Sequence, residues 1–182
     1  MKSILISIRP KWTEKIANGE KTIEVRKTAP QEVPFKCYIY ETKGQYVKFT
    51  HGAHTKYGYG RGKVIGEFIC DKVYSIKNRG SSFSVADEEQ SVTNEIARQS
   101  CLYYDDMVSY FGNKDGCGWH ISDLKIYDKP KELSEFCIPC KVSCENCKNP
   151  LYFECWCEEK GKKIVTRPPL SWCYVEDLGE EK

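Results

Sequence analysis

The chain has 182 residues, of which 40% are hydrophobic and 30% are charged, and its formal net charge is +2. This length and apolar content suit one globular unit with its own core, with an appendage at most. No apolar run approaches the ~20 residues that cross a bilayer, and the N-terminus is charged too early for a signal peptide, so we expect a soluble, cytoplasmic protein.

Charge is distributed unevenly along the chain. Residues 1–80 carry 16 Lys and Arg against 7 Asp and Glu, whereas residues 81–182 carry 12 against 19. Two halves of opposite sign indicate either that the first presents a basic surface to a polyanion or that the halves attract each other within one fold. The sequence leaves both interpretations open.

Short β-patterned runs alternate with a few helices. A strand at 4–8 precedes a helix at 12–17, which Pro10 can start and Asn18-Gly19 can end. Further strands are predicted at 22–27, 36–42, 62–70, 119–127 and 171–175, and helices at 93–101, with Thr93 as N-cap, and at 105–111, closed by Gly112. The pattern predicts an α+β fold built on a small β-barrel of about five or six strands with flanking helices.

The stretch at 19–26 places four ionisable side chains where a strand begins. If the chain is extended from residue 22, Thr22, Glu24 and Arg26 point to one face and the two apolar residues between them to the other. The apolar face can join the core. The polar face is either a solvated edge or a small pocket for a polar ligand.

Residues 42–66 contain no Asp or Glu and interleave basic side chains with aromatic rings and glycines. Basic groups neutralise phosphates and rings stack on bases, which suits a single-stranded nucleic acid. The side chains expected to contact it are Lys43, Lys48, Lys56, Tyr57, Tyr59, Arg61 and Lys63. The alternative is a long solvated hairpin whose tyrosines pack locally.

Seven of the 11 cysteines lie between residues 137 and 173. In a chain without a secretory signal, such clustering favours metal binding over a disulfide framework. Two Cys-x-x-Cys pairs could hold one structural zinc ion; they are Cys137 with Cys140 and Cys144 with Cys147, and Cys155 and Cys157 are alternates for one pair. A further alternative leaves all six as reduced thiols. The scattered cysteines before residue 137 are expected to be buried free thiols.

The pattern Gly19-x-Lys21-x-x-Glu24-x-Arg26, which follows a short strand and a helix, resembles the signature of the ASCH domain, a member of the PUA-like β-barrel superfamily. The resemblance covers residues 3–127, with a closing strand at 171–174. The chain also resembles small stand-alone ASCH proteins of bacteria and phages. We accordingly divide the chain into a barrel at 1–135, a Cys-rich insertion at 136–167, and a closing strand with an acidic tail at 168–182.

The resemblance implies a cleft that binds RNA or a nucleotide. The residues that would line it or shape it are Arg9, Trp12, Gly19, Lys21, Glu24 and Arg26. Lysine and arginine can hold a phosphate, Glu24 can accept a hydrogen bond from an exocyclic amine, and Trp12 can stack on a base. The ordinary alternative is a surface ion pair beside a core tryptophan.

One branch of this superfamily comprises small amidohydrolases that deacetylate 4-acetylcytidine with a lysine, a threonine and a glutamate. Lys21 matches the lysine, but Glu24 stands where that branch has its threonine, and Thr22 lies next to Lys21. If the chain is an enzyme, these three residues would be catalytic, provided that burial lowers the lysine pKa. Binding of RNA, single-stranded nucleic acid or a nucleotide therefore ranks first, nucleoside hydrolysis second, and protein interaction through the Cys-rich segment third.

Overall fold

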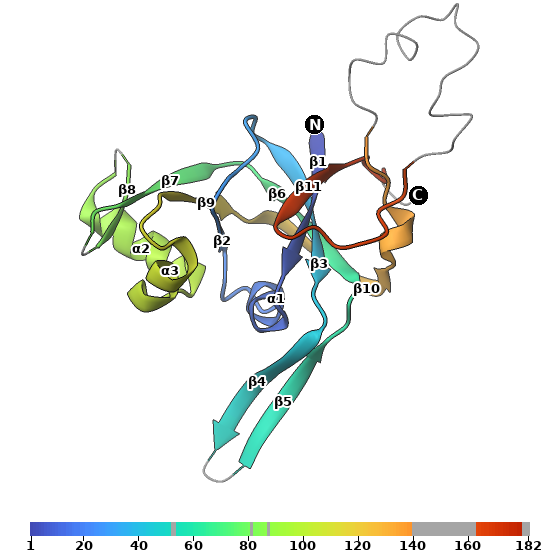
Figure 1. Ribbon diagram of the computed structural model, residues 1–182, viewed down its shortest axis with the longest axis horizontal. Coiled ribbons are helices and arrows are strands. Elements are labelled where there is room, and N and C mark those ends of the chain that lie inside the picture. The colour runs from blue at the N-terminus through green and yellow to red at the C-terminus, as the bar shows by residue number, and fades with distance from the viewer. Residues whose placement is uncertain (52–53, 81, 87, 140–162, 180–182) are drawn as a thin grey trace, which may run out of the picture.

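The fold is of the α+β class and consists mostly of strands (Figure 1). The computed structural model describes residues 1–51, 54–80, 82–86, 88–139 and 163–179. The strands are β1 (Lys2–Ile8), β2 (Ile23–Arg26), β3 (Phe35–Glu41), β4 (Gly44–His51), β5 (His54–Gly60), β6 (Val64–Cys70), β7 (Val73–Asn78), β8 (Phe83–Val85), β9 (Gly116–His120), β10 (Ser122–Lys131) and β11 (Trp172–Val175). The helices are α1 (Pro10–Ala17), α2 (Gln90–Ser100) and α3 (Tyr104–Phe111), with a 3-10 turn η1 (Leu133–Glu135).

A five-stranded sheet with the order β10-β6-β3-β1-β11 forms the centre of the molecule. β1 lies in this sheet because both of its faces are apolar: Ile4 and Ile6 enter one core cluster and Leu5 enters another. β3 runs parallel to β1, and β11 runs antiparallel to it on the other side. The strand expected at 171–175 therefore returns to pair with the first strand of the chain.

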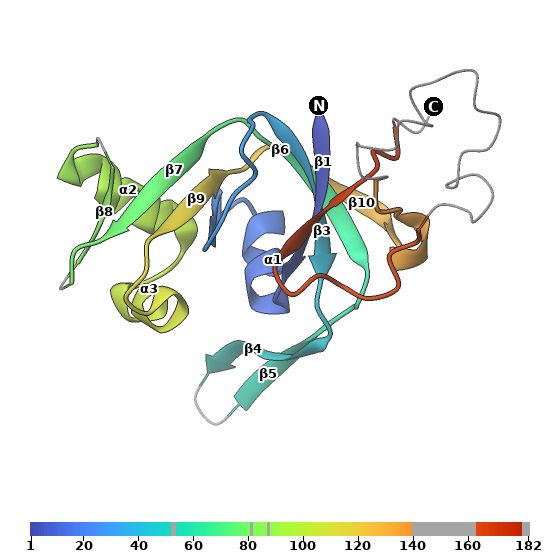
Figure 2. The ribbon, with the colours of Figure 1, turned by 45° about the horizontal axis from the view of Figure 1, so that its top comes forward.

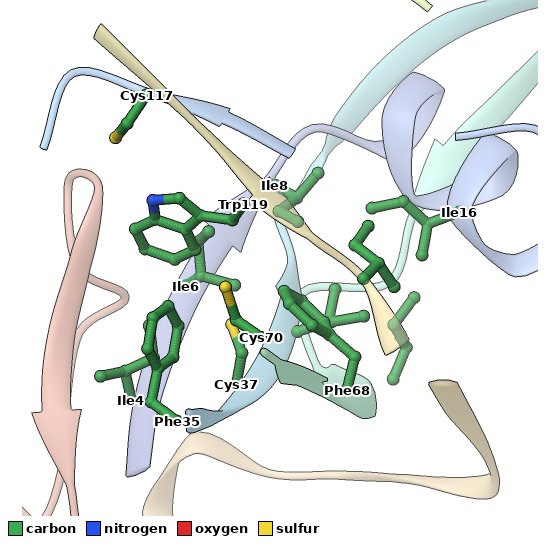
Figure 3. Close-up of a cluster of buried hydrophobic side chains, with 13 residues drawn as sticks. Ile4, Ile6, Ile8, Ile16, Phe35, Cys37, Phe68, Cys70, Cys117 and Trp119 are labelled. Carbon is green, nitrogen blue, oxygen red and sulfur yellow. The ribbon is translucent and has the colours of Figure 1, made fainter. Parts of the chain in front are cut away.

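The main core lies on one face of this sheet and centres on Trp119, which is fully buried (Figure 3). Its ring meets the ring of Phe35 edge to face, with the centroids 5.2 Å apart. Cys37, Cys70 and Cys117 pack in the same cluster as free thiols. The expected burial is thus confirmed for these three, whereas Cys101, for which it was also expected, is only half-buried at the end of α2.

A second sheet, with the order β2-β9-β7-β8, carries α2 and α3. Ile23 and Val25 of β2 pack against Ile96 of α2 and against Met107 and Phe111 of α3. The predicted apolar face of β2 is thus confirmed as a core face, and the helices that cover it come from a distant part of the chain.

β4 and β5 form a two-stranded arm that extends away from both sheets (Figures 1 and 2). The arm is fixed at its foot by the buried Glu41, which accepts hydrogen bonds from the Thr13 hydroxyl (2.5 Å) and from the Arg61 backbone N–H (2.8 Å). A side chain at Gly60 would overlap the Thr42 carbonyl oxygen, so glycine lets the arm leave the sheet at this point.

Several sequence expectations need correction. No closed barrel is seen among the described residues: their strands are divided among sheets of five, four and two strands, and β4, β5, β7 and β8 were not among the predicted strands. The run at 119–127 is split between β9 and β10, which lie in different sheets. Thr93 is not an N-cap: α2 begins at Gln90, and the Thr93 hydroxyl accepts a hydrogen bond from the Val85 N–H.

The two ends of the predicted Cys-rich insertion are held together. Cys137 and Ile164 form an antiparallel bridge, and the neighbouring Phe136 and Val165 are buried in the core cluster on the second face of the main sheet. Five of the proposed zinc ligands, Cys140, Cys144, Cys147, Cys155 and Cys157, lie outside the described residues. Within the described ranges, no three His, Cys, Asp or Glu side chains are grouped to hold a metal, and no helix is long and apolar enough to span a membrane.

Candidate functional site

The site is built around the turn that joins α1 to β2. α1 begins at Pro10 and ends at Ala17 with Asn18 as its C-cap, and Gly19 continues the chain with a φ of +74° that disfavours other residues. The backbone N–H of Lys21 then donates to the Lys15 carbonyl oxygen. This turn directs the Lys21 side chain inward, so that it is only 2% exposed.

Three charged side chains, Lys21, Glu24 and Arg26, form a buried group that we call the β2 charge cluster. The ammonium of Lys21 lies 3.4 Å from one carboxylate oxygen of Glu24. It also donates to the Ile23 carbonyl (2.8 Å) and to that of Ser100 (2.7 Å), the last residue of α2. Burial lowers the pKa of Lys21, although the Glu24 charge opposes this.

Arg26 completes the cluster from the other side. One of its terminal nitrogens lies 2.9 Å from Glu24 Oε1 and donates to the Ser7 carbonyl of β1 at 2.7 Å. Two atoms of the cluster remain unsatisfied: Glu24 Oε2 and Arg26 Nε are buried, and neither makes a hydrogen bond to the described residues. Because Glu24 Oε2 faces the Lys21 ammonium at 3.4 Å, the free group that the cluster offers is the Arg26 Nε donor.

Two aromatic residues flank the cluster. Trp12 of α1 is half-buried, and its ring centre lies 5.4 Å from the Lys21 ammonium and 4.5 Å from that of the exposed Lys11. Tyr110 of α3 is partly exposed; burial raises its pKa, while a hydrogen bond to Arg26 opposes the rise.

The other predicted site residues do not contact the β2 charge cluster among the described contacts. Arg9 and Gly19 are exposed, and no described contact joins Arg9 to the β2 charge cluster. Thr22 is half-buried; its backbone pairs with Gln99 and Ile121, and no described contact brings its hydroxyl to the cluster. The Ser7 and Ser100 carbonyls and the Tyr110 ring were not foreseen, because no local pattern marks a residue that reaches the site through tertiary packing.

The predicted nucleic-acid contacts of residues 42–66 lie along the arm. Tyr57 and Tyr59 are 53% and 71% exposed. Lys43, Lys56 and Arg61 are exposed as well. Lys48 and Lys63 are engaged in ion pairs within the fold, Lys48 with Glu14 at 2.7 Å and Lys63 with Glu132 at 2.6 Å.

Both interpretations of the charge asymmetry find support. Four ion pairs join a base of residues 1–80 to an acid of residues 81–182; they are Lys36–Asp177, Lys63–Glu132, Lys72–Glu88 and Lys77–Asp115. The halves therefore attract each other within the fold. The arm, however, retains exposed cations in a segment without acids.

The sequence matches no known protein-family profile, and no curated protein shows a significant match. Solved structures do match: the ASCH protein from Zymomonas mobilis has a TM-score of 0.54 and 16% identity over 96% of this chain and 88% of that one. A tyrosine-to-phenylalanine mutant of that protein gives 0.54 and 16%, covering 97% and 91%, and a serine-to-alanine mutant gives 0.55 and 16%, covering 96% and 89%. The chain therefore has the ASCH fold.

Proposed function

Because the chain has the ASCH fold, we propose that it binds RNA or another single-stranded nucleic acid and holds one nucleotide at the β2 charge cluster. The observation that carries this proposal is the buried Arg26 Nε donor of the cluster, which makes no hydrogen bond to the described residues. A buried donor without a partner costs about 1–3 kcal/mol, so a ligand that accepts from it is favoured. Glu24 Oε2, which lies beside the Lys21 ammonium, can in addition accept from an exocyclic amine of adenine, cytosine or guanine.

The neighbouring groups fit a nucleotide as well. Arg26 Nε can donate to a carbonyl oxygen on the same base edge, and the half-buried Trp12 provides a ring on which the base can stack. Since the cluster itself is almost fully enclosed, the nucleotide is expected to enter beside Trp12. Lys11, whose ammonium lies over the same ring, is then close to the phosphate.

Fluorescence anisotropy with labelled single-stranded RNA tests this proposal. We expect micromolar binding that weakens as salt rises, because phosphate contacts release counterions. Trp12→Leu and Glu24→Gln should weaken binding, with folding checked by circular dichroism. Glu20→Gln alters an exposed carboxylate of the same turn and should leave binding unchanged. An absence of salt-sensitive binding at micromolar protein would contradict the proposal.

Hydrolysis of an acylated nucleoside is the second candidate function. It is supported by the 3.4 Å separation of Lys21 and Glu24 and by the lowered pKa of Lys21, which favours a neutral amine. Against it, two backbone carbonyls already hold the Lys21 ammonium. Incubation with 4-acetylcytidine and chromatography decides: turnover that Lys21→Ala abolishes would establish an enzyme, and absence of product would exclude this substrate.

The Cys-rich segment is the third proposed site, for one structural zinc ion and a protein partner. Of its proposed ligands only Cys137 is described, as a half-buried free thiol at the root of the segment. Metal analysis of the purified protein tests for zinc. Cys140→Ser should release the metal, and whether it disturbs folding or only partner capture separates a structural from an interaction role.

A further inference from the structure

The arm has one face that packs on the body and one that faces solvent. Tyr46 lies on the packed face: its ring covers Gly58, and both burial and a hydrogen bond to Glu14 of α1 raise its pKa. The solvent-exposed face, which we call the outer face of the arm, follows from the register. It contains the cross-strand pairs Gln45–Tyr59 and Val47–Tyr57, because directly paired residues of an antiparallel ladder point to the same side.

The outer face is unusually apolar for a free surface. Val47 and Tyr57 are each 53% exposed and Tyr59 is 71% exposed, although a two-stranded ribbon has no second layer to cover them. Exposed apolar side chains that adjoin one another mark an interaction site more often than isolated ones do. These side chains are therefore expected to contact a partner.

The spacing of the two tyrosines fits a nucleobase. Positions two residues apart on one face of a strand are separated by about 6.7 Å. Stacked bases repeat at about 3.4 Å, so one base fits between two parallel rings at twice that distance. The Gln45 amide lies opposite Tyr59 and has the donor and acceptor needed to hydrogen-bond the edge of such a base.

Charge selects the class of partner. Lys43 and Arg61 are exposed and flank the Gly44–Gly60 pair at the foot of the arm. Residues 42–66 include no acid, so the arm carries only positive formal charge. The charge disfavours a second, equally basic arm, and the exposed Tyr57 and Tyr59 rings favour a polyanion with flat aromatic groups over a merely acidic protein surface.

We propose that the outer face of the arm binds single-stranded nucleic acid, with one base held between Tyr57 and Tyr59 and the adjoining phosphates near Lys43 and Arg61. This inference rests on the proposed function and deepens it, since it gives the polymer a second binding surface away from the β2 charge cluster. The strand can continue from the arm across α1, where Lys11 lies over Trp12, to the β2 charge cluster.

The test compares two ligands on matched variants. Anisotropy is measured with labelled ten-nucleotide RNA and DNA of one sequence, and with a labelled mononucleotide. The double variant Tyr57→Ala/Tyr59→Ala should bind the oligonucleotides about tenfold more weakly or worse, because a stacked base is lost, and should bind the mononucleotide as the native protein does. The double variant Tyr57→Phe/Tyr59→Phe keeps both rings and should retain affinity. Tyr103→Ala, at another exposed tyrosine, should leave the affinity for the oligonucleotides unchanged.

The outcomes separate this inference from the proposed function. Unchanged oligonucleotide affinity in the double alanine variant overturns the arm inference alone. If that variant instead changes its oligomeric state, as measured by sedimentation, the outer face is a contact between copies of the chain. If affinity depends on the two tyrosines but not on Glu24, the arm inference holds and the placement at the β2 charge cluster fails. Absence of binding by every ligand overturns both. The RNA and DNA arms show which polymer is preferred.

Discussion

The β2 charge cluster and the outer face of the arm depart from the usual distribution of side chains in opposite directions. In the cluster, three charged residues are at most 7% exposed; on the arm, two tyrosines are more than half exposed. Buried charges and adjoining exposed rings are the informative exceptions to a pattern that most side chains follow. Both exceptions occur within the first third of the chain, after α1.

The two regions differ in how far their side chains find partners within the fold. The charges of the cluster largely satisfy one another and the backbone around them, so the cluster holds β2, β1 and the end of α2 in place. The exposed Tyr57 and Tyr59 rings of the arm, by contrast, make no hydrogen bond or ring contact with the described residues. We therefore expect changes in the cluster to alter mainly stability, and changes on the arm to alter mainly affinity.

Replacing Glu24 should produce the largest effect. In Glu24→Ala the charges of Lys21 and Arg26 lose their shared counter-ion while remaining buried, and removal of one partner from a buried ion pair costs about 3–5 kcal/mol. Urea denaturation measures the free energy of unfolding. Equal stability of this variant and the native protein would show that the cluster does not stabilise the fold. The expected difference between the cluster, which affects stability, and the arm, which affects affinity, would then be lost.

Gly60→Ala should have the next largest effect, at the foot of the arm. The added methyl group would overlap the Thr42 carbonyl oxygen and the Pro10 ring, and such overpacking typically costs about 1–3 kcal/mol. Because the foot must shift, oligonucleotide affinity should fall even though no exposed side chain has changed. Gly60 does not have a positive φ, so this loss is expected from the overlap and not from backbone strain.

Alkaline pH should destabilise the core beside the cluster. Burial raises the thiol pKa values of Cys37, Cys117 and Cys70, the last to about 12. Unfolded thiols ionise near 8.5, so above that pH the unfolded state loses protons that the native state retains, and the free energy of unfolding falls as pH rises. Urea denaturation under reducing conditions should show this fall. It should be shallower in Cys70→Ala, and an identical fall in both proteins would contradict the assignment.

Excising residues 140–162 should have the smallest effect on either region. The bridge between Cys137 and Ile164, together with the burial of Phe136 and Val165, holds the two ends at the spacing of a strand pair. A short Gly-Ser linker should therefore preserve both stability and oligonucleotide affinity. A large loss of stability would mean that the segment supports the core, whereas a selective loss of affinity would move part of the binding surface to it.

Local pattern was sufficient for the elements that carry the cluster. The alternation of Thr22 to Arg26 predicted the two faces of β2, and Pro10 with Asn18-Gly19 predicted both ends of α1, because these features depend on neighbouring residues alone. The depth to which the β2 charge cluster is buried could not be predicted from local pattern. It depends on carbonyls of Ser7 and Ser100, which reach the cluster only through the pairing of distant elements.

The arm shows the opposite difficulty. Its composition predicted either a nucleic-acid contact or a solvated hairpin, and a hairpin of two strands is present, but the partition into outer and packed faces could not be derived. That partition depends on the register, which places Tyr59 opposite Gln45 and Tyr46 opposite Gly58. Alternation of side chains along a strand identifies its buried face only when every second residue is apolar, and in the arm glycines interrupt this alternation.

The hydrogen bond between Lys21 and Ser100 also has a consequence for the order of folding. Its two residues are 79 positions apart in the chain, and the Lys21 ammonium cannot leave water until α2 has docked on β2. Contacts of such large separation are formed at a high cost in chain entropy, so the cluster is expected to close late, after the sheet that contains β1 and β3. A nascent chain that has not yet reached residue 100 would keep this charge hydrated.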